Sequence, residues 1–312
     1  MRVLAVFNQK GGVGKTTLAR AAAHFAARPE FGNLRVLVVD LDPQASFSKL
    51  CLDMRHDQKL GTLPPVHEDY NPDHPEDQGW DGRSSSANIF LNPERIVPYT
   101  VVKPTLVENL HLLPARKSDL SLVEYQDRGA LAERVFDQLQ LFCDAPEVQE
   151  AYDLIIFDIG PKESPLYTSA LRAATHLLIP VVPERQCTDG LLEMLKLWGD
   201  ERARRGQSGR ELSLVGIAIN KFDARYGAHK FSVDQMMDNP RIAIHVCGTV
   251  ISQRASIMER DMATEQPLTV FDLPKSADVR QLMVDLMAEV FAKMFPEQRD
   301  YFEGLGSPEM RS

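Results

Sequence analysis

The sequence predicts an α/β fold with a doubly wound, mostly parallel sheet and helices on both faces. Two observations indicate it. Apolar runs of strand length alternate with helix-favouring stretches along the 312 residues, and strands that are apolar throughout are typical of parallel sheets covered on both faces. A glycine-rich loop at residues 8–17, NQKGGVGKTT, also stands between the first apolar run and the first helical stretch. Strand, glycine loop and helix in this order indicate a phosphate-binding unit.

The expected strands are apolar runs bounded by polar residues. They occupy residues 2–8, 35–42, 109–115, 152–160, 175–183 and 212–223. The expected helices include residues 16–27, 128–142, 189–205 and 276–295. The last helix is amphipathic and carries acids as well as bases on its polar face, so we expect it to pack on the core rather than on a membrane. We expect one domain over residues 1–295 and a C-terminal tail over residues 296–312.

Residues 53–88 interrupt the alternation of strands and helices. They are rich in Pro, Asp, Glu, Gly and Ser, and a segment of this composition without periodicity is typical of a long surface insertion. His56, His67 and His74 lie there among carboxylates. Their spacing is irregular for a metal site, so we expect a solvated loop, with a metal site as the alternative.

Composition narrows the classes of function. The formal net charge is -9, which argues against a surface coated with nucleic-acid-binding residues. Residues 51–150 hold 9 Lys and Arg against 18 Asp and Glu, whereas residues 201–250 hold 8 against 5, so a face for a polyanion is expected in the second half. No apolar run approaches the roughly 18 residues of a membrane span, and no signal pattern is present, so we expect a cytoplasmic protein with no membrane partner.

The four cysteines are scattered, with no C-x-x-C pair. This spacing does not indicate zinc, an iron–sulfur cluster or a redox dithiol, so we expect reduced, mostly buried thiols.

The glycine-rich loop carries the strongest chemical signal. Its glycines allow successive N–H groups to point inward, and the following helix adds its positive dipole end, so the loop can hold phosphate oxygens. Lys15 supplies a charge to the β- and γ-phosphates, the Thr16 hydroxyl suits Mg²⁺, and Thr17 suits the α-phosphate. The strict pattern G-x-x-x-x-G-K-[ST] fails because Gln9 stands at its first glycine. The predicted nucleotide-binding residues here are Lys10, Gly11, Gly12, Val13, Gly14, Lys15, Thr16 and Thr17.

Carboxylates follow two of the expected strands. Asp158 ends the run YDLIIFD, and this position suits a Walker-B acid that fixes Mg²⁺. Asp40 and Asp42 end the run VLVVDLD, and alternate strand residues share a face, so both can point into one cleft. Ligands bind at the carboxyl ends of parallel strands, which predicts a site here. The alternative is that Asp40 and Asp42 cap the next helix or turn.

Four blocks of sequence resemble the ParA/MinD family of deviant Walker ATPases, and particularly the ParA-type DNA partition proteins. They are KGGVGKTT at 10–17, DLDPQ at 40–44, YDLIIFDIGP at 152–161 and LLIPVVPE at 177–184. Their order and spacing match as well. The resemblance covers most of the chain apart from residues 53–88 and about the last dozen. It implies ATP and Mg²⁺ as cofactors and a weak, Mg²⁺-dependent ATPase activity.

The resemblance implies roles for particular residues. Lys10 would reach across a nucleotide-sandwich dimer to the phosphates bound by the partner, so that ATP joins two chains. Asp42 would position the attacking water, Asp40 would support the metal, and Asp158 would be the Walker-B acid. Lys10, Lys15 and Asp42 are thus the expected catalytic residues, and Thr16, Asp40 and Asp158 the expected metal residues.

Recognition of the base is less well defined by the resemblance. Asn220 resembles the family residue that contacts adenine, and Leu273 and Pro274 fall where the family lays a backbone segment along the base. The string NKFD at 220–223 also echoes the guanine-reading motif of GTPases, whose aspartate would be Asp223. The family commonly has D-x-P-P after the Walker-B strand, whereas Gly160 stands here in place of a proline.

The family binds DNA without sequence preference, which requires basic residues aligned along a dimer face. The candidates are Arg202, Arg204, Arg205, Arg210, Lys221, Arg225, Lys230 and Arg254. The alternative for each of them is an ordinary solvated charge on the surface. The P-loop strand begins at residue 2, so we expect no N-terminal helix-turn-helix extension and no reading of a specific operator. The implied partners are a second copy of the chain, non-specific DNA and a ParB-like protein, and the implied location is the nucleoid.

Three other functions stay open at this point. The chain could position a cargo other than DNA on the nucleoid. A MinD-like membrane cycle would need a basic amphipathic C-terminus, which the sequence does not show. An iron-protein reductase would need cluster-ligating cysteines, which the cysteine spacing does not provide.

Overall fold

The computed structural model describes residues 1–74, 80–93, 96–103, 106–124, 130–184, 187–206, 210–255 and 269–307. Its centre is a seven-stranded sheet with the order β5-β6-β2-β7-β1-β8-β9. Adjacent strands are parallel except for β5, which is antiparallel to β6. The strands are β1 Arg2–Val6, β2 Val36–Asp40, β5 Tyr99–Val101, β6 Val107–Leu113, β7 Leu154–Asp158, β8 His176–Val181 and β9 Ser213–Ile219.

The mostly parallel α/β sheet predicted from the sequence is confirmed. All six expected strands are present within a few residues of their predicted bounds, and the edge strand β5 is an addition. Along β1 the side chains alternate between two cores: Leu4 and Val6 belong to one, Val3 and Ala5 to the other. Both cores are apolar, which is why central strands such as β1 and β7 are continuous apolar runs in the sequence.

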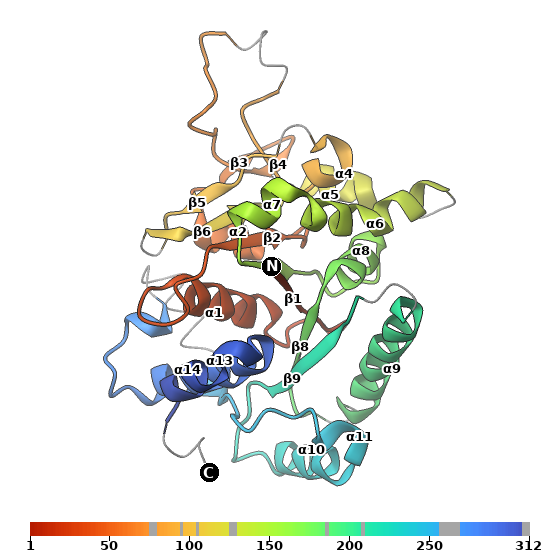
Figure 1. Ribbon diagram of the computed structural model, residues 1–312, viewed down its shortest axis with the longest axis vertical. Coiled ribbons are helices and arrows are strands. Elements are labelled where there is room, and N and C mark those ends of the chain that lie inside the picture. The colour runs from red at the N-terminus through yellow and green to blue at the C-terminus, as the bar shows by residue number, and fades with distance from the viewer. Residues whose placement is uncertain are drawn as a thin grey trace.

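Helices cover both faces of the sheet (Figure 1). One face is covered by α1 Lys15–Ala27, α13 Asp278–Met294 and α14 Arg299–Leu305, and the other by α6 Ala130–Asp144, α8 Pro165–Ala173 and α9 Cys187–Arg205. The shorter helices are α2 Ser46–Cys51, α4 Asn88–Leu91, α5 Lys117–Glu124, α7 Pro146–Ala151, α10 Gly227–Asp238, α11 Pro240–Ala243, η2 Val270–Asp272 and η3 Pro296–Gln298.

The end of the chain is folded onto the domain as far as residue 307. Within the segment expected to be a tail, η3 and α14 follow α13, and Phe302 of α14 is fully buried. Its ring lies 5.6 Å from that of Phe291 and 5.7 Å from that of Phe295. The aromatic contact makes α14 part of the core that covers α1.

The segment 53–88 contains more structure than its composition predicts. β3 Arg55–Asp57 and β4 Gly61–Leu63 form an antiparallel hairpin, so the expectation of a segment without regular structure is wrong there. His67 is buried against the Tyr99 ring instead of lying in a solvated loop. Ser86 is also buried, and its hydroxyl donates to the Asp40 carbonyl at 2.6 Å. The insertion therefore supports the end of β2.

Two further expectations concern the whole chain. Cys51, Cys143, Cys187 and Cys247 are buried, as expected, and none of them forms a disulfide in the described part of the chain. Among the helices that the structure describes, none combines the length and apolar character needed to cross a bilayer.

Candidate nucleotide site

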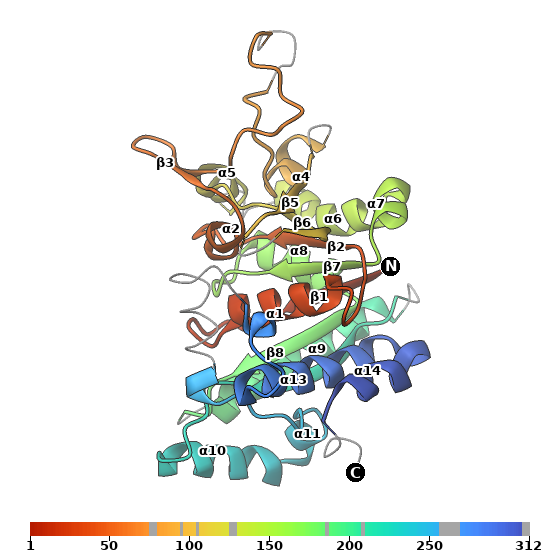
Figure 2. The ribbon, with the colours of Figure 1, turned by 90° about the vertical axis from the view of Figure 1, so that its left-hand side faces the viewer.

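The predicted site residues converge at the carboxyl edge of the sheet. β7 lies between β1 and β2, and its last residue, Asp158, is paired in register with Val6 and with Asp40. The loop that follows β1 leads into α1, so the start of α1 lies beside these carboxylates, on the left in Figure 2. This is the edge at which open parallel sheets bind ligands.

The loop has the backbone of a phosphate-binding loop. Gly12 and Gly14 have positive φ angles of 74° and 95°, which glycine adopts without the penalty of a side chain. A Cβ atom on Gly14 would also lie 2.1 Å from the Asn220 Nδ2 atom. Position 14 therefore requires glycine for two independent reasons.

Lys15 points into the site. Only 7% of the residue is exposed, and its Nζ atom donates to the Lys10 carbonyl at 3.0 Å. Burial lowers the pKa of Lys15, while the charges of Asp158 and Asp42 oppose that change. A buried ammonium with so few partners is suited to phosphate oxygens, which match its charge.

Asp158 is the clearest sign of a metal site. It is fully buried, and neither carboxylate oxygen accepts a hydrogen bond within the described residues. Burial and the neighbouring Asp40 charge raise its pKa well above the ordinary value; the adjacent Thr16 hydroxyl and Lys15 oppose the rise. An unsatisfied buried carboxylate beside a hydroxyl fits a Mg²⁺ ion with its water shell. No group of three or more His, Cys, Asp or Glu in the described ranges could hold a metal alone, so phosphate oxygens would complete the coordination.

Asp40 has a structural role in this conformation. Its Oδ2 atom accepts from the Ser48 amide at 3.0 Å and from the Ser48 hydroxyl at 2.6 Å, and its Oδ1 atom accepts from the Asp42 amide at 3.1 Å. Burial raises its pKa to about 7, against the effect of the Ser48 hydrogen bonds. Capping of α2, which the sequence left open as the alternative, is what the structure shows, and metal support by Asp40 stays a prediction.

Asp42 lies at the open edge of the site, half-buried. Its Oδ1 atom accepts from the Gln44 amide at 2.9 Å. Gly160 lies next to it, since a Cβ atom on Gly160 would be 3.5 Å from the same Oδ1 atom. The missing side chain at position 160 therefore leaves space beside the carboxylate that is expected to position water.

Lys10 and Gln9 point away from their own loop. The Lys10 Nζ atom forms an ion pair with the Glu184 Oε2 atom at 2.6 Å, and both side chains are 54% exposed. Gln9 donates to the Glu163 carboxylate on the loop after β7. The two lysines of the loop thus differ: Lys15 faces the site, and Lys10 faces the surface.

Asn220 and Lys221, which follow β9, hold the phosphate-binding loop from behind. The Asn220 Nδ2 atom donates to the Val13 carbonyl at 2.9 Å, and the Lys221 Nζ atom donates to the Gly12 carbonyl at 2.6 Å. C=O and N–H groups of a trans peptide point in opposite directions, so these bonds turn the Val13 and Gly14 N–H groups toward the inside of the loop. The contact of Asn220 with adenine, implied by the resemblance, stays a prediction. The role of Lys221 in holding the loop was not predicted, although the Asn-Lys pair at 220–221 marks the position in the sequence.

The assignment of Leu273 and Pro274 to the base stays a prediction. Arg28, which follows α1, donates to Asp272 at 2.6 Å and fixes η2 at the C-terminal end of α1. The helix has 13 residues, so this end lies roughly 20 Å from the loop at about 1.5 Å per residue. Leu273 packs against the apolar core there.

A cavity of about 580 Å³ lies immediately beyond Lys221. It is lined by Phe222, Asp223, Ala224, Arg225, Ser252, Gln253 and Arg254. Asn220 and Lys221, which contact the phosphate-binding loop, directly precede Phe222 in the wall of this cavity.

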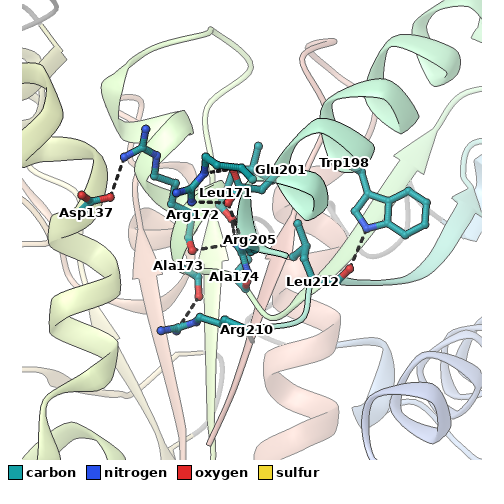
Figure 3. A network of polar contacts seen from close by, with 11 residues as sticks. Asp137, Leu171, Arg172, Ala173, Ala174, Trp198, Glu201, Arg205, Arg210 and Leu212 are labelled. Atoms are coloured by element: carbon teal, nitrogen blue, oxygen red, sulfur yellow. Dashed lines mark hydrogen bonds and ion pairs between the residues drawn. The ribbon is translucent and has the colours of Figure 1, made fainter. Parts of the chain in front are cut away.

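The predicted DNA-binding arginines of α9 do not form a free basic face. Arg205 is 4% exposed; its guanidinium binds Glu201 at 2.7 Å and the carbonyls of Leu171, Arg172 and Ala174 at 2.5 to 2.8 Å (Figure 3). Arg205 therefore joins α9 to the end of α8, and its assignment to DNA is wrong.

The neighbouring arginines are also engaged. Arg204 pairs with Glu201 at 2.7 Å, Arg210 pairs with Asp144 at 2.7 Å, and the Arg202 guanidinium stacks 4.9 Å from the Trp198 ring. α9 has 19 residues, so its arginines lie roughly 28 Å from its first residue, Cys187, which follows closely on Glu184, the partner of Lys10. By contrast, Lys230 and Arg254 are exposed. Ser232, in the same helix as Lys230, donates to the carbonyl of Glu184, the partner of Lys10, and Arg254 lines the cavity beyond Lys221.

These features define a P-loop nucleotide-binding protein: a phosphate-binding loop that contains a buried lysine, a helix that follows the loop, and a buried aspartate beside it that accepts no hydrogen bond within the described residues. Residues 1–203 match the AAA domain family model, and the chain is 32% identical to the chromosome-partitioning ATPase Soj of Thermus thermophilus over 72% of this chain and 71% of that protein. The chain therefore belongs to the ParA/Soj-type partition ATPase family within this AAA domain group.

Two other comparisons add to this. The chromosome partitioning protein ParA of Caulobacter vibrioides is 30% identical over 72% of this chain and 71% of its own. The ATP complex of a Cyanothece McdA variant has the same fold, with a TM-score of 0.65, 15% identity and 98% of both chains covered. The chain spans 41% and 49% of the length of two rhizobial relatives described as replication protein A.

Proposed function

We propose that this chain is a partition ATPase in which ATP joins two subunits into a dimer that binds DNA without sequence preference. Slow hydrolysis, stimulated by a ParB-like partner, releases the dimer and so moves plasmid or chromosomal DNA on the nucleoid. The observation that carries the proposal is the contrast between two lysines of one loop: Lys15 is buried in its own site, whereas Lys10 is half exposed and paired only with Glu184 among the described residues.

Each residue of the site has a defined task in this function. The N–H groups of the loop and Lys15 bind the phosphates, and Asp158 with the Thr16 hydroxyl holds Mg²⁺. When bound, Mg²⁺ neutralises charge on the β- and γ-phosphates. Asp42, at the open edge beside Gly160, orients the attacking water. The base occupies the cavity beyond Lys221.

Lys10 supplies the link between nucleotide and dimer. Its exposed ion pair with Glu184 has a stability of about 0–1 kcal/mol, so little holds it in place. A triphosphate on the partner offers a stronger, multiply charged acceptor. Dimer affinity therefore depends on bound ATP.

The proposed DNA face lies on the side of the nucleotide edge. Lys230 and Arg254 are exposed there, and no ion pair involves either of them in the described part of the chain. Dimerisation doubles this small patch, and the local field at contact matters more than the acidic net charge. Loss of either residue should weaken DNA binding uniformly across sequences and reduce its salt dependence by about one phosphate contact.

The experiment measures the mass of the chain in solution with ATP and Mg²⁺ by light scattering. Wild-type protein should dimerise, and Lys10→Ala should stay monomeric while it still binds ATP, because Lys15 is intact. Lys49→Ala, which removes an exposed lysine on α2 whose Nζ atom donates to the Gln44 carbonyl, is the matched control and should dimerise. Normal dimerisation of Lys10→Ala would contradict the cross-subunit role, and full hydrolysis by Asp42→Ala would contradict the role of Asp42.

A further inference from the structure

The cavity beyond Lys221 contains an unusual pair of charges. The Arg225 guanidinium donates from Nε to Asp223 Oδ1 at 2.9 Å and from Nη2 to Oδ2 at 2.7 Å, and the Arg225 amide donates to Oδ1 at 3.0 Å. The Arg225 side chain is 87% exposed and that of Asp223 only 7%. Both oxygens of a carboxylate in the wall of the cavity are therefore covered by one exposed arginine.

Guanine and adenine present different hydrogen-bonding groups at the edge of the base that a carboxylate can contact. Guanine presents two adjacent donors, N1–H and the N2 amino group, and a carboxylate can accept both. Adenine presents the N6 amino donor next to the N1 acceptor, so a carboxylate meets an acceptor there. A guanidinium has only donors, so it repels the donor edge of guanine and can bond to the acceptor nitrogens of adenine.

The position of Asp223 makes this difference relevant. Asn220 and Lys221 fix the phosphate-binding loop, and Asp223 follows them in the wall of the adjoining cavity. The Asp223 amide donates to His229 Nδ1 at 3.0 Å, which fixes the backbone of this turn against α10. The backbone of Asp223 is thus held in place, whereas the Arg225 side chain extends into solvent.

We propose that Arg225 makes the site selective for adenine by covering the Asp223 carboxylate, and that without Arg225 the same carboxylate admits guanine nucleotides. The inference rests on the proposed binding of a nucleotide with its base in this cavity. It assigns the selectivity to a residue that contacts neither the phosphates nor the metal.

The experiment compares the affinities for fluorescent ATP and GTP analogues, with Mg²⁺ and without DNA. Arg225→Ala should bind the GTP analogue about tenfold more tightly than wild type does, a difference of about 1.4 kcal/mol. The double variant Arg225→Ala with Asp223→Asn should lose this gain, since an amide cannot accept two bonds from guanine. Arg241→Ala, which removes an exposed arginine on α11 outside the cavity, should leave both affinities unchanged.

The outcomes separate this inference from the proposed function. Unchanged selectivity in Arg225→Ala, with ATP binding intact, would overturn the role of Arg225. A gain for GTP that persists without the Asp223 carboxylate would overturn the role of Asp223. A wild-type chain that bound neither nucleotide would overturn the proposed function and this inference together. Removal of Arg225 takes the guanidinium partner from the Asp223 carboxylate, so thermal melting of Arg225→Ala and of the double variant checks that both are folded.

Discussion

The contact between Asn220 and the phosphate-binding loop can be tested by its removal. Asn220→Ala deletes the donor to the Val13 carbonyl, and that carbonyl lies in a residue that is only 2% exposed. A buried carbonyl that loses its partner costs about 1–3 kcal/mol. The loop can recover a partner only by turning its peptide, which would turn the inward N–H groups away from the phosphates.

This cost should appear in nucleotide binding as well as in stability. If the loop must be returned to its binding conformation at a cost of about 1.4 kcal/mol, the dissociation constant for ATP rises about tenfold. We expect Asn220→Ala to show this rise in isothermal titration with Mg²⁺ and ATP. Urea denaturation should show a loss of about 1–3 kcal/mol in the free energy of unfolding.

A second asparagine provides the control. Asn239 caps α11 by accepting from the Arg241 amide at 3.0 Å and makes no contact with the loop. Asn239→Ala should lower stability by about 1 kcal/mol and leave ATP affinity unchanged. If Asn220→Ala lost stability but bound ATP with wild-type affinity, the residue would be a structural one only, and the orientation of the loop would not depend on it.

Three further predictions concern the site and its surroundings. Gly14→Ala should abolish ATP binding because its Cβ would collide with Asn220 at 2.1 Å. Gly12→Ala has no atom within 4 Å of its Cβ, so its free energy of unfolding should fall by only about 1–2 kcal/mol from the positive φ angle. Titration of both variants with ATP checks this. Arg205→Ala leaves Arg204 as the partner of Glu201 but removes the donor to the carbonyls of Leu171, Arg172 and Ala174. It should lower the free energy of unfolding in urea by about 1–3 kcal/mol, while the DNA affinity of the folded protein stays unchanged. Since burial raises the pKa of Asp158, the affinity for Mg²⁺ and ATP should rise with pH as its proton leaves, and the nucleotide-free protein should lose stability over the same rise. Asp158→Asn should weaken both dependences, and the raised pKa of Asp40 accounts for the dependence of stability that remains.

The sequence predicts the sheet well because the physics behind its strands is local. A run such as residues 152–160 is apolar on both faces, and only a strand buried on both faces needs that pattern. β5 was missed because it has three residues and lies at the edge, where only one side is paired. Length and burial, rather than residue type, decide whether such a segment forms a strand.

Roles that depend on distant contacts could not be predicted. The sequence left two roles open for Asp40, and only the position of Ser48, eight residues later, decides that its carboxylate caps α2. Similarly, the position of η2 depends on which end of α1 the chain returns to. The contact between Arg28 and Asp272 determines that end, and no local pattern reveals it.

The arginines of α9 could have been interpreted correctly from the sequence. A helix that follows a parallel strand runs back toward the amino edge of the sheet, so the end of residues 189–205 had to lie far from the glycine loop. Glu201 also stands three and four residues before Arg204 and Arg205, the spacing of intrahelical ion pairs. Both signals indicate that these arginines form a structural cluster at the amino edge of the sheet, whereas a DNA-binding face controlled by nucleotide should lie near the carboxyl edge.

The position of the DNA face decides whether nucleotide can control it. A ligand changes binding at a second site only if the protein with the ligand and the protein without it differ in affinity at that second site. In the proposed dimer, Lys10 would bring the carboxyl edges of two sheets together, so basic residues near that edge, such as Lys230 and Arg254, would change their surroundings when ATP binds. A face at the end of α9 lies roughly 28 Å away along the helix and would bind DNA equally well in the monomer. DNA affinity that rises with ATP in wild type, but not in Lys10→Ala, is therefore expected only if the face lies at the nucleotide edge.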